Sequence, residues 1–381
     1  MPVSLDADGK ARPARQGEAR TRVDMTSGDS QSVQYRPTEW GGRSRILIRL
    51  FRRVAYALGI VLYHLRLHRL VMHLSRRRPK VLLYHSVAQD EPLFLRELES
   101  TIHPDVFERH LRFVVRHYHV VPVSRLDYGP VPERSLAVTF DDGYRSVLTQ
   151  AAPLLQRWGV PATAYLVTSV LDRAELIWVD ELNWFLRTQL EAARLVAARL
   201  ECAEDTPVLE LLNYARLRGT PDVLRALLKQ LRRQYGCEPA KEAHSQLYLS
   251  WQDALVLRSF GFELGNHTHS HLCLPAQKPA TQLAEIRDAR ERLSERLGPV
   301  KSFAFPFGDH DAASKAVARK AGHSTVMLVG GVNRSVPDPG RLARIPVSAE
   351  DDASLFAEIE VVPAAVAAAA RLLRILGLRN R

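Results

Sequence analysis

Two short stretches of the sequence place carboxylates and imidazoles where they could hold a metal ion. Asp141 and Asp142 are adjacent and follow an apolar run, while His267 and His271 are four residues apart. Two neutral imidazoles and one carboxylate suit Zn²⁺ or a similar divalent ion, and they leave coordination sites for water and substrate. A bound ion lowers the pKa of a coordinated water towards neutrality. The residue types therefore indicate metal-assisted hydrolysis.

Each stretch also has a simpler interpretation. Adjacent carboxylates repel each other, so Asp141 and Asp142 need a cation, a shared proton or open water, and a solvated acidic turn would suffice. Histidines at this spacing are often a surface accident, although one helical turn would bring His267 and His271 to the same face. Because both stretches follow predicted strands in one chain, the metal site is favoured.

Three predicted strands carry these residues at their C-terminal ends. The run 136–140 ends at Asp141, the run that starts at Phe262 ends at the histidines, and the run 80–84 ends at His85. Parallel α/β folds keep their chemistry at the C-terminal ends of the strands. In a barrel His85 would point into the same mouth as Asp141; alternatively, it is a hydrogen-bonded core residue.

Strands alternate with helices along most of the chain, which implies parallel β/α units. Strands are expected at 80–87, 118–123, 136–140, 159–167, 300–305, 324–329 and 342–347, with helices at 103–117, 146–158, 250–260 and 280–297. Residues 170–249 differ, because long stretches rich in Leu, Ala, Arg and Glu predict a helical insert. This insert could shape the substrate cleft or merely brace the barrel.

Three segments together resemble the motifs of the polysaccharide deacetylase family, the NodB-homology domain of the family-four carbohydrate esterases. They are Thr139–Gly143, His267–His271 and, as a looser match, Phe303–Gly308. The resemblance covers about residues 80–347. It implies a distorted (β/α) barrel, TIM-like with seven strands, carrying here a helical insert. It also implies a hydrolase of non-peptide carbon–nitrogen bonds, a glycan N-deacetylase.

The resemblance assigns roles to five residues. Asp141 would be the catalytic base, and Asp142, His267 and His271 would bind one divalent metal ion, with Zn²⁺ preferred. The backbone N–H of Phe307 would stabilise the oxyanion. The residue types agree with the first role, because Asp141 can take a proton from water once a cation neutralises its neighbour.

Two departures from the family pattern concern the base and the acid. Many members have an arginine in the third motif that orients the base, and Ala304 occupies that position here. The late Leu-x-His motif, which supplies the catalytic acid, is missing, with no histidine around Arg344. The proton for the leaving amine must then come from His85, His269 or Asp309, of which His85 is included among the candidate catalytic residues. Some family branches acting on exopolysaccharides show a similar pattern, so these losses do not imply inactivity.

The net charge of +11 lies entirely in the N-terminal segment. Residues 1–80 hold 17 Lys and Arg against 6 Asp and Glu, and the remainder balances at 36 of each. Nucleic acid is therefore not expected as a partner. Residues 1–42 are polar without a hydrophobic period, so we expect a disordered tail and no secretory signal.

Apolar residues at three-and-four spacing among arginines predict a basic amphipathic helix at 43–78. This helix could lie on an anionic membrane surface, or pack on the domain or on a second subunit. Its longest charge-free run is too short to span a bilayer. The deacetylase domain is expected at 79–350 and an Ala-rich C-terminal helix within 351–381. The expected location is the cytoplasm, with peripheral attachment to the inner membrane surface.

The sequence thus predicts a metal-dependent hydrolase that removes N-acetyl groups from a sugar in a polysaccharide, an oligosaccharide or a lipid-linked glycan. One alternative is a catalytically silent glycan-binding protein on the same fold, favoured by the missing arginine and the missing late histidine. Another keeps the metal chemistry but acts on a small amide or an O-acetyl ester.

Overall fold

The computed structural model describes residues 42–127, 129–172 and 175–376. Residues 1–41 of the predicted tail and the last five residues of the predicted C-terminal segment lie outside these ranges.

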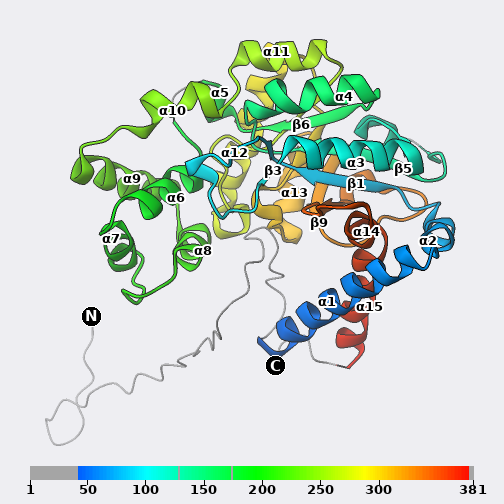
Figure 1. Ribbon diagram of the computed structural model, residues 1–381. Coiled ribbons are helices and arrows are strands. Elements are labelled where there is room, and N and C mark those ends of the chain that lie inside the picture. Colours follow the sequence, from blue (N-terminus) through cyan, green and yellow to red (C-terminus); the bar gives the residue numbers. More distant parts are fainter. Residues whose placement is uncertain (1–41, 128, 173–174, 377–381) are drawn as a thin grey trace, which may run out of the picture. The chain divides into compact units, whose positions relative to one another are not determined.

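The core of the fold is a closed barrel of seven parallel strands (Figure 1). β1 pairs with β10 on one side and with β5 on the other, so the sheet has no free edge at this point. The barrel strands are β1 (Lys80–Tyr84), β5 (Ser135–Phe140), β6 (Ala162–Leu166), β7 (Glu263–Asn266), β8 (Ser302–Ala304), β9 (Thr325–Val329) and β10 (Leu342–Pro346). The predicted seven-stranded (β/α) barrel is thus confirmed.

The sequence of the barrel strands follows from their burial on both faces. Every residue of β5 and β9 is buried, and both strands are continuous runs of β-branched and apolar residues rather than alternating ones. Inside the barrel, Tyr165 packs with Ala304 and Met327. A glycine is required at position 265, because a Cβ there would lie 2.4 Å from the Tyr165 ring.

The predicted strand at 118–123 is only partly present. β4 (His119–Val120) pairs with the beginning of β5 and then ends. Pro122 has no N–H to donate to a neighbouring strand, and a 3₁₀ turn, Val123–Asp127, follows it. Two further short strands, β2 (Ser86–Val87) and β3 (Thr101–Ile102), pair with each other outside the barrel.

The helices lie outside the barrel; the first two precede β1, and the others follow it along the chain. They are α1 (Gly42–His64), α2 (His68–Ser75), α3 (Pro104–His117), α4 (Ala152–Trp158), α5 (Thr168–Leu171), α6 (Trp178–Thr188), α7 (Ala192–Arg199), α8 (Val208–Arg218), α9 (Pro221–Tyr235), α10 (Pro239–Leu247), α11 (Trp251–Ser259), α12 (Pro279–Leu297), α13 (Ala312–Lys320), α14 (Asp352–Phe356) and α15 (Val362–Ile375). A π-helical turn, η7 (Ala357–Val361), joins α14 to α15.

The segment predicted as a helical insert forms α6 to α10 and has a hydrophobic core of its own. Phe185, Leu211 and Leu227 are fully buried in it. The same core includes Tyr144 and Leu272, which belong to loops at the C-terminal ends of β5 and β7. The insert therefore packs directly on the edge of the barrel where the candidate catalytic residues lie.

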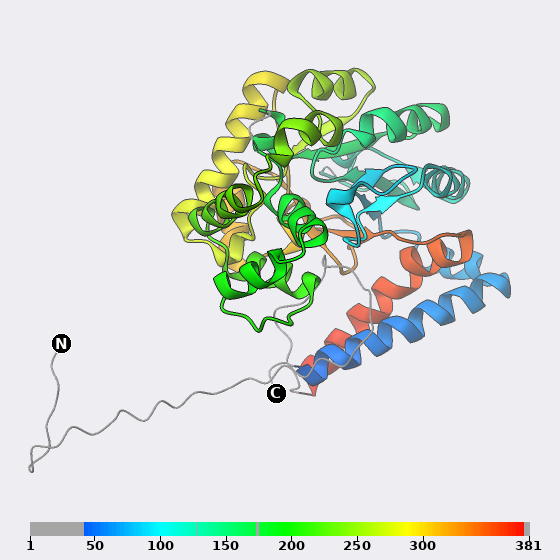
Figure 2. The same cartoon turned by 60° about the vertical axis from the view of Figure 1, so that its left-hand side comes forward.

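The predicted helix at 43–78 is two helices, α1 and α2. The chain turns between them at Arg66, whose φ of 60° is left-handed and cannot continue an α-helix. α1 lies along α15 and η7 (Figure 2). The contact is close at Gly59, where a Cβ would lie 2.5 Å from the Cβ of Ala357. One face of α1 is thus packed on the domain.

Candidate active site

The two adjacent carboxylates follow β5 and line the same pocket. Asp141 follows β5 directly, and its N–H donates to the carbonyl of Tyr84 on β1. Asp142 has a φ of 73°, which turns the chain sharply before Gly143. Both side chains are buried, at 3 % and 6 % exposure, so the solvated acidic turn is excluded.

The histidines lie in a loop after β7, and the helical turn considered from their spacing is wrong. Thr268 and His271 both have left-handed φ values, 71° and 55°. Side chains hold this loop: Asn266 accepts from the N–H of Thr268, and the hydroxyl of Thr268 accepts from the N–H of His271. Glu285 of α12 accepts from two further amides of the loop. These bonds, rather than helix periodicity, bring the two imidazoles together.

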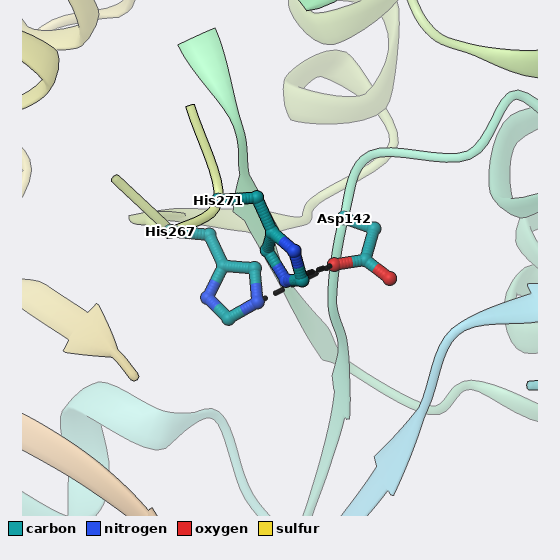
Figure 3. A group of neighbouring side chains, drawn as sticks. All are labelled: Asp142, His267 and His271. Carbon is teal, nitrogen blue, oxygen red and sulfur yellow. Dashed lines mark ion pairs between the residues drawn. The ribbon is translucent and has the colours of Figure 1, made fainter. Parts of the chain in front are cut away.

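Asp142, His267 and His271 form a compact buried cluster (Figure 3). The Nε2 atoms of His271 and His267 lie 3.1 and 3.4 Å from Oδ1 of Asp142. Ligand atoms about 2.1 Å from a tetrahedral Zn²⁺ lie roughly 3.4 Å apart. The spacing of the three donor atoms therefore fits one divalent ion.

The hydrogen bonds around the cluster also suit a metal ion. Nδ1 of His267 lies 2.8 Å from the carbonyl of Ala304, which can only accept, so Nδ1 carries a hydrogen and Nε2 is the nitrogen available to bind an ion. Oδ1 of Asp142 is buried without a hydrogen-bond donor among the described residues. Burial raises the pKa of Asp142, but His271 and His267 outweigh it and hold that pKa well below its usual range. A cation would satisfy the ionised oxygen.

Asp141 is paired with an arginine that the sequence analysis did not identify. Nη1 and Nη2 of Arg344, on β10, lie 2.6 and 2.7 Å from the two carboxylate oxygens of Asp141. Arg344 is fully buried. Burial raises the pKa of Asp141, but the charges of Arg344 and then His267 outweigh this effect. The pKa of Asp141 therefore lies below its usual value, and the carboxylate is ionised. The arginine expected at Ala304 is thus absent from the third motif but present on another strand.

One pocket brings most of the predicted residues together. It is lined by the metal-site cluster and Asp141, and also by His85, Phe307 and, from the insert, Val179 and Asp180. The sequence analysis did not single out Asp180. The insert therefore shapes the pocket, and it also braces the site, since Nε1 of Trp178 donates to the carbonyl of His271 at 2.9 Å.

Two of the three candidate proton donors do not line this pocket. Nδ1 of His269 bonds to the hydroxyl of Thr168 at 2.7 Å. Asp309 forms an ion pair with Arg216 of α8, which is buried. Only His85 lies at the pocket, where burial lowers its pKa most and the two aspartates oppose that effect.

Phe307 lies in a strained turn beside the histidines. Its φ of 58° is left-handed, and its ring centroid lies 4.5 Å from that of His271. Of the nine non-glycine residues with positive φ in the described chain, four belong to this site: Asp142, Thr268, His271 and Phe307. Such strain persists only where the surrounding structure holds it, and it clusters at functional sites.

The chain is similar to known proteins in its sequence pattern and in its fold. The sequence pattern of the polysaccharide deacetylase family matches residues 128–326 of the chain. Similar solved structures include the deacetylase PplD from Streptococcus pyogenes, with 14% identity and a TM-score of 0.46 over 71% of this chain and 92% of that one. A de-N-acetylase from Aggregatibacter actinomycetemcomitans has 16% identity and a TM-score of 0.47, over 72% and 95%. IcaB from Ammonifex degensii has 18% identity and a TM-score of 0.45, over 74% of this chain and 97% of that one. No curated protein sequence matches the chain significantly.

Proposed function

The chain belongs to the polysaccharide deacetylase family, and we propose that it is a divalent-metal-dependent hydrolase of glycan N-acetyl groups. Its substrate would be an N-acetylated sugar in a polysaccharide, an oligosaccharide or a lipid-linked glycan. The observation that carries the metal dependence is the buried cluster of Asp142, His267 and His271 beside the ionised Asp141. Zn²⁺ is the preferred ion because the donors are two imidazoles and one carboxylate.

In this proposal Asp142, His267 and His271 hold the ion, which would polarise the acetyl carbonyl and acidify a water molecule. Asp141 takes the proton from the attacking water, and Arg344 fixes both oxygens of Asp141 for that transfer. The N–H of Phe307, in its left-handed turn, donates to the oxygen that becomes negative. The acyl carbon–nitrogen bond then breaks, releasing acetate and the sugar amine.

Metal content and acetate release test this proposal together. His271→Ala should lose most bound metal and activity, whereas Asp141→Asn should keep the metal and lose about 10²–10⁴-fold in turnover. His269→Gln is the matched control for metal content, because it changes a histidine of the same loop that does not line the pocket. Full metal occupancy in His271→Ala would contradict the assigned site.

The two alternatives make different predictions. A catalytically silent binding protein needs neither an ionised base nor its arginine, whereas here both are buried and paired. Burying such a pair is costly without a role for it. Acetate release from N-acetylated oligosaccharides, compared with that from small amides and O-acetylated sugars, separates the remaining substrate classes.

We also propose that the enzyme binds an anionic membrane surface through α1 and α2, on the cytoplasmic side. The sequence has no acidic residue between Glu39 and Asp90. Although one face of α1 is packed, another exposes a continuous apolar stripe: Ile46, Leu47, Leu50, Phe51, Val54, Leu58, Val61 and Leu65. Such a helix among arginines suits the boundary between lipid headgroups and acyl chains. The helical stretch Asp352–Ile375 is also apolar and long enough to cross a bilayer, and 44% of its most apolar window is buried inside the protein.

A further inference from the structure

The leaving amine needs a proton, and the family's usual source of it is missing from this chain. An amide nitrogen leaves poorly as an anion, so a positioned acid is required when the carbon–nitrogen bond breaks. Asp141 is bound on both oxygens by Arg344 and acts as the base. The other titratable side chains among the described residues of this pocket are those of His85, Tyr144 and Asp180.

Asp180 is a carboxyl group that the insert places in the pocket. It lies in the first turn of α6 and is 1 % exposed, yet it has no cationic partner that the structure describes. Its Oδ2 accepts from the hydroxyls of Tyr144, at 2.9 Å, and Tyr248, at 2.5 Å. Its Oδ1 is buried and makes no hydrogen bond within the described chain.

This arrangement determines where a proton on Asp180 would lie. Both tyrosine hydroxyls donate to Oδ2, so this oxygen is the acceptor in both bonds. A proton on the carboxyl group therefore sits on Oδ1, the oxygen without a partner. Burial, and then the negative charge of Asp142, raises the pKa of Asp180 to about 8, although Tyr248 and Tyr144 oppose this. Because the side chain is buried and has no cationic partner among the described residues, its neutral, protonated form is favoured.

We propose that Asp180 is the catalytic acid, donating the proton on Oδ1 to the leaving amine nitrogen. The nitrogen–hydrogen bond forms as the acyl carbon–nitrogen bond breaks, and the electron pair of the broken bond stays on nitrogen. Asp180 is left as a carboxylate, stabilised by the two tyrosine hydroxyls on Oδ2. The proton that Asp141 took from water then passes through solvent to Asp180. Each cycle therefore consumes one water molecule and leaves the protonation of the enzyme unchanged. This inference rests on the proposed function.

The test compares leaving groups in Asp180→Asn. Asparagine keeps the size of the side chain and an oxygen for the tyrosines, but it has no acidic proton. Acetate release from N-acetylglucosamine oligomers should fall about 10²–10⁴-fold in kcat, with KM and metal content little changed. Hydrolysis of 4-nitrophenyl acetate should stay within a few-fold of wild type, because its phenolate leaves without protonation.

Two matched variants complete the test. Glu181→Gln changes the next carboxylate of α6, which is paired with Arg232. Any loss of activity in this variant should be equal for the amide and the ester substrate. His85→Gln tests the competing donor in the same pocket. A selective loss of amide hydrolysis in His85→Gln and not in Asp180→Asn overturns the inference, as do equal losses on both substrates in Asp180→Asn. A wild-type protein that hydrolyses only the ester overturns the proposed function itself and, with it, this role.

Discussion

Arg344, on β10, binds Asp141, which is the base in the proposed mechanism. Its guanidinium binds both oxygens of Asp141, and its Cζ lies 5.3 Å from the ring centroid of Tyr165. In the sequence, the segment around Arg344 differs from the family pattern only by its missing histidine, and nothing there indicates a contact to Asp141. Along the chain Arg344 is 203 residues from Asp141, so only the closure of β10 onto β1, and of β1 onto β5, brings them together.

Substitution of Arg344 should affect turnover more than substrate binding. Arg344→Lys keeps the charge but cannot form the two parallel bonds, so we expect kcat to fall roughly 10–100-fold, as for other groups that orient side chains at a metal site. Arg344→Met should lose more activity. It should also lose about 3–5 kcal/mol of stability, because Asp141 is left buried without its partner.

The pH profile distinguishes positioning from mere stability. Arg344 holds the pKa of Asp141 low, so its removal raises that pKa. The acidic limb of kcat should then move to higher pH in Arg344→Met and stay closer to wild type in Arg344→Lys. Unchanged turnover and an unmoved acidic limb in Arg344→Met would show that the pair does not serve the base.

At the scale of elements, a buried histidine joins α3 to the barrel. Nε2 of His110 lies 2.7 Å from the carbonyl of Ala349, and the hydroxyl of Tyr84 on β1 lies 3.1 Å from Nδ1. A neutral imidazole satisfies both partners, with Nε2–H donating and Nδ1 accepting. Burial lowers the pKa of His110 to about 4, and the nearby Arg109 adds to this although the bond to Ala349 opposes it.

This element should lose stability in mild acid. Below pH 6.5 the unfolded chain takes up a proton at His110 that the folded chain takes up only near pH 4, so folding becomes less favourable as pH falls through this window. The loss between pH 7 and pH 5 corresponds to about 2 kcal/mol from this residue. His323, whose pKa burial also lowers to about 4, contributes in the same direction.

Denaturant unfolding of His110→Gln at pH 7 and pH 5 checks this expectation. The variant should be less stable than wild type at pH 7, but its further loss at pH 5 should be smaller by about 2 kcal/mol. His119→Gln is the control, because His119 is exposed at β4. Equal losses in wild type and His110→Gln would contradict the account.

At the scale of the whole molecule, α1 has one face packed on the domain and an opposite apolar face that is exposed. Ala55 and Gly59 lie against the domain, whereas Leu50, Val54 and Leu58 are between 50% and 58% exposed. Near an anionic surface each basic residue contributes about 1 kcal/mol, and the apolar stripe adds burial in lipid. Removal of α1 would expose α15 and η7, so surface substitutions are a cleaner test than truncation.

The full-length protein should sediment with vesicles that contain phosphatidylglycerol at low salt and be released at high salt. The triple variant Leu50→Glu, Val54→Glu and Leu58→Glu should stay in the supernatant and still deacetylate a water-soluble oligosaccharide. Its matched control replaces three exposed leucines elsewhere by Glu: Leu190, Leu217 and Leu255. If wild type ignores anionic vesicles and forms a dimer that the first triple variant abolishes, the stripe is a subunit interface instead.

The residues of the barrel strands and of the candidate metal cluster could be predicted from the sequence because their signals are local. A buried parallel strand is a short apolar run, and a polar residue at its end, such as Asp141, is visible without knowledge of neighbouring strands. The parallel β/α units and the helical insert were predictable on this basis, whereas the seven-stranded barrel and the family followed from the resemblance of three motifs to the polysaccharide deacetylases. The helical turn assumed for His267 and His271 was wrong because hydrogen bonds from Asn266 and Thr268 fix that loop.

Tertiary structure alone decided the partners of these residues. Arg344 reaches Asp141 only because the barrel closes, and Asp180 reaches the pocket only because the insert packs on the barrel edge. Neither contact has a sequence period or spacing that could reveal it, since each joins segments whose separation along the chain carries no information on distance. The same holds for α1: its amphipathic pattern gave the apolar residues, but only packing against η7 and α15 determined which of them remain exposed.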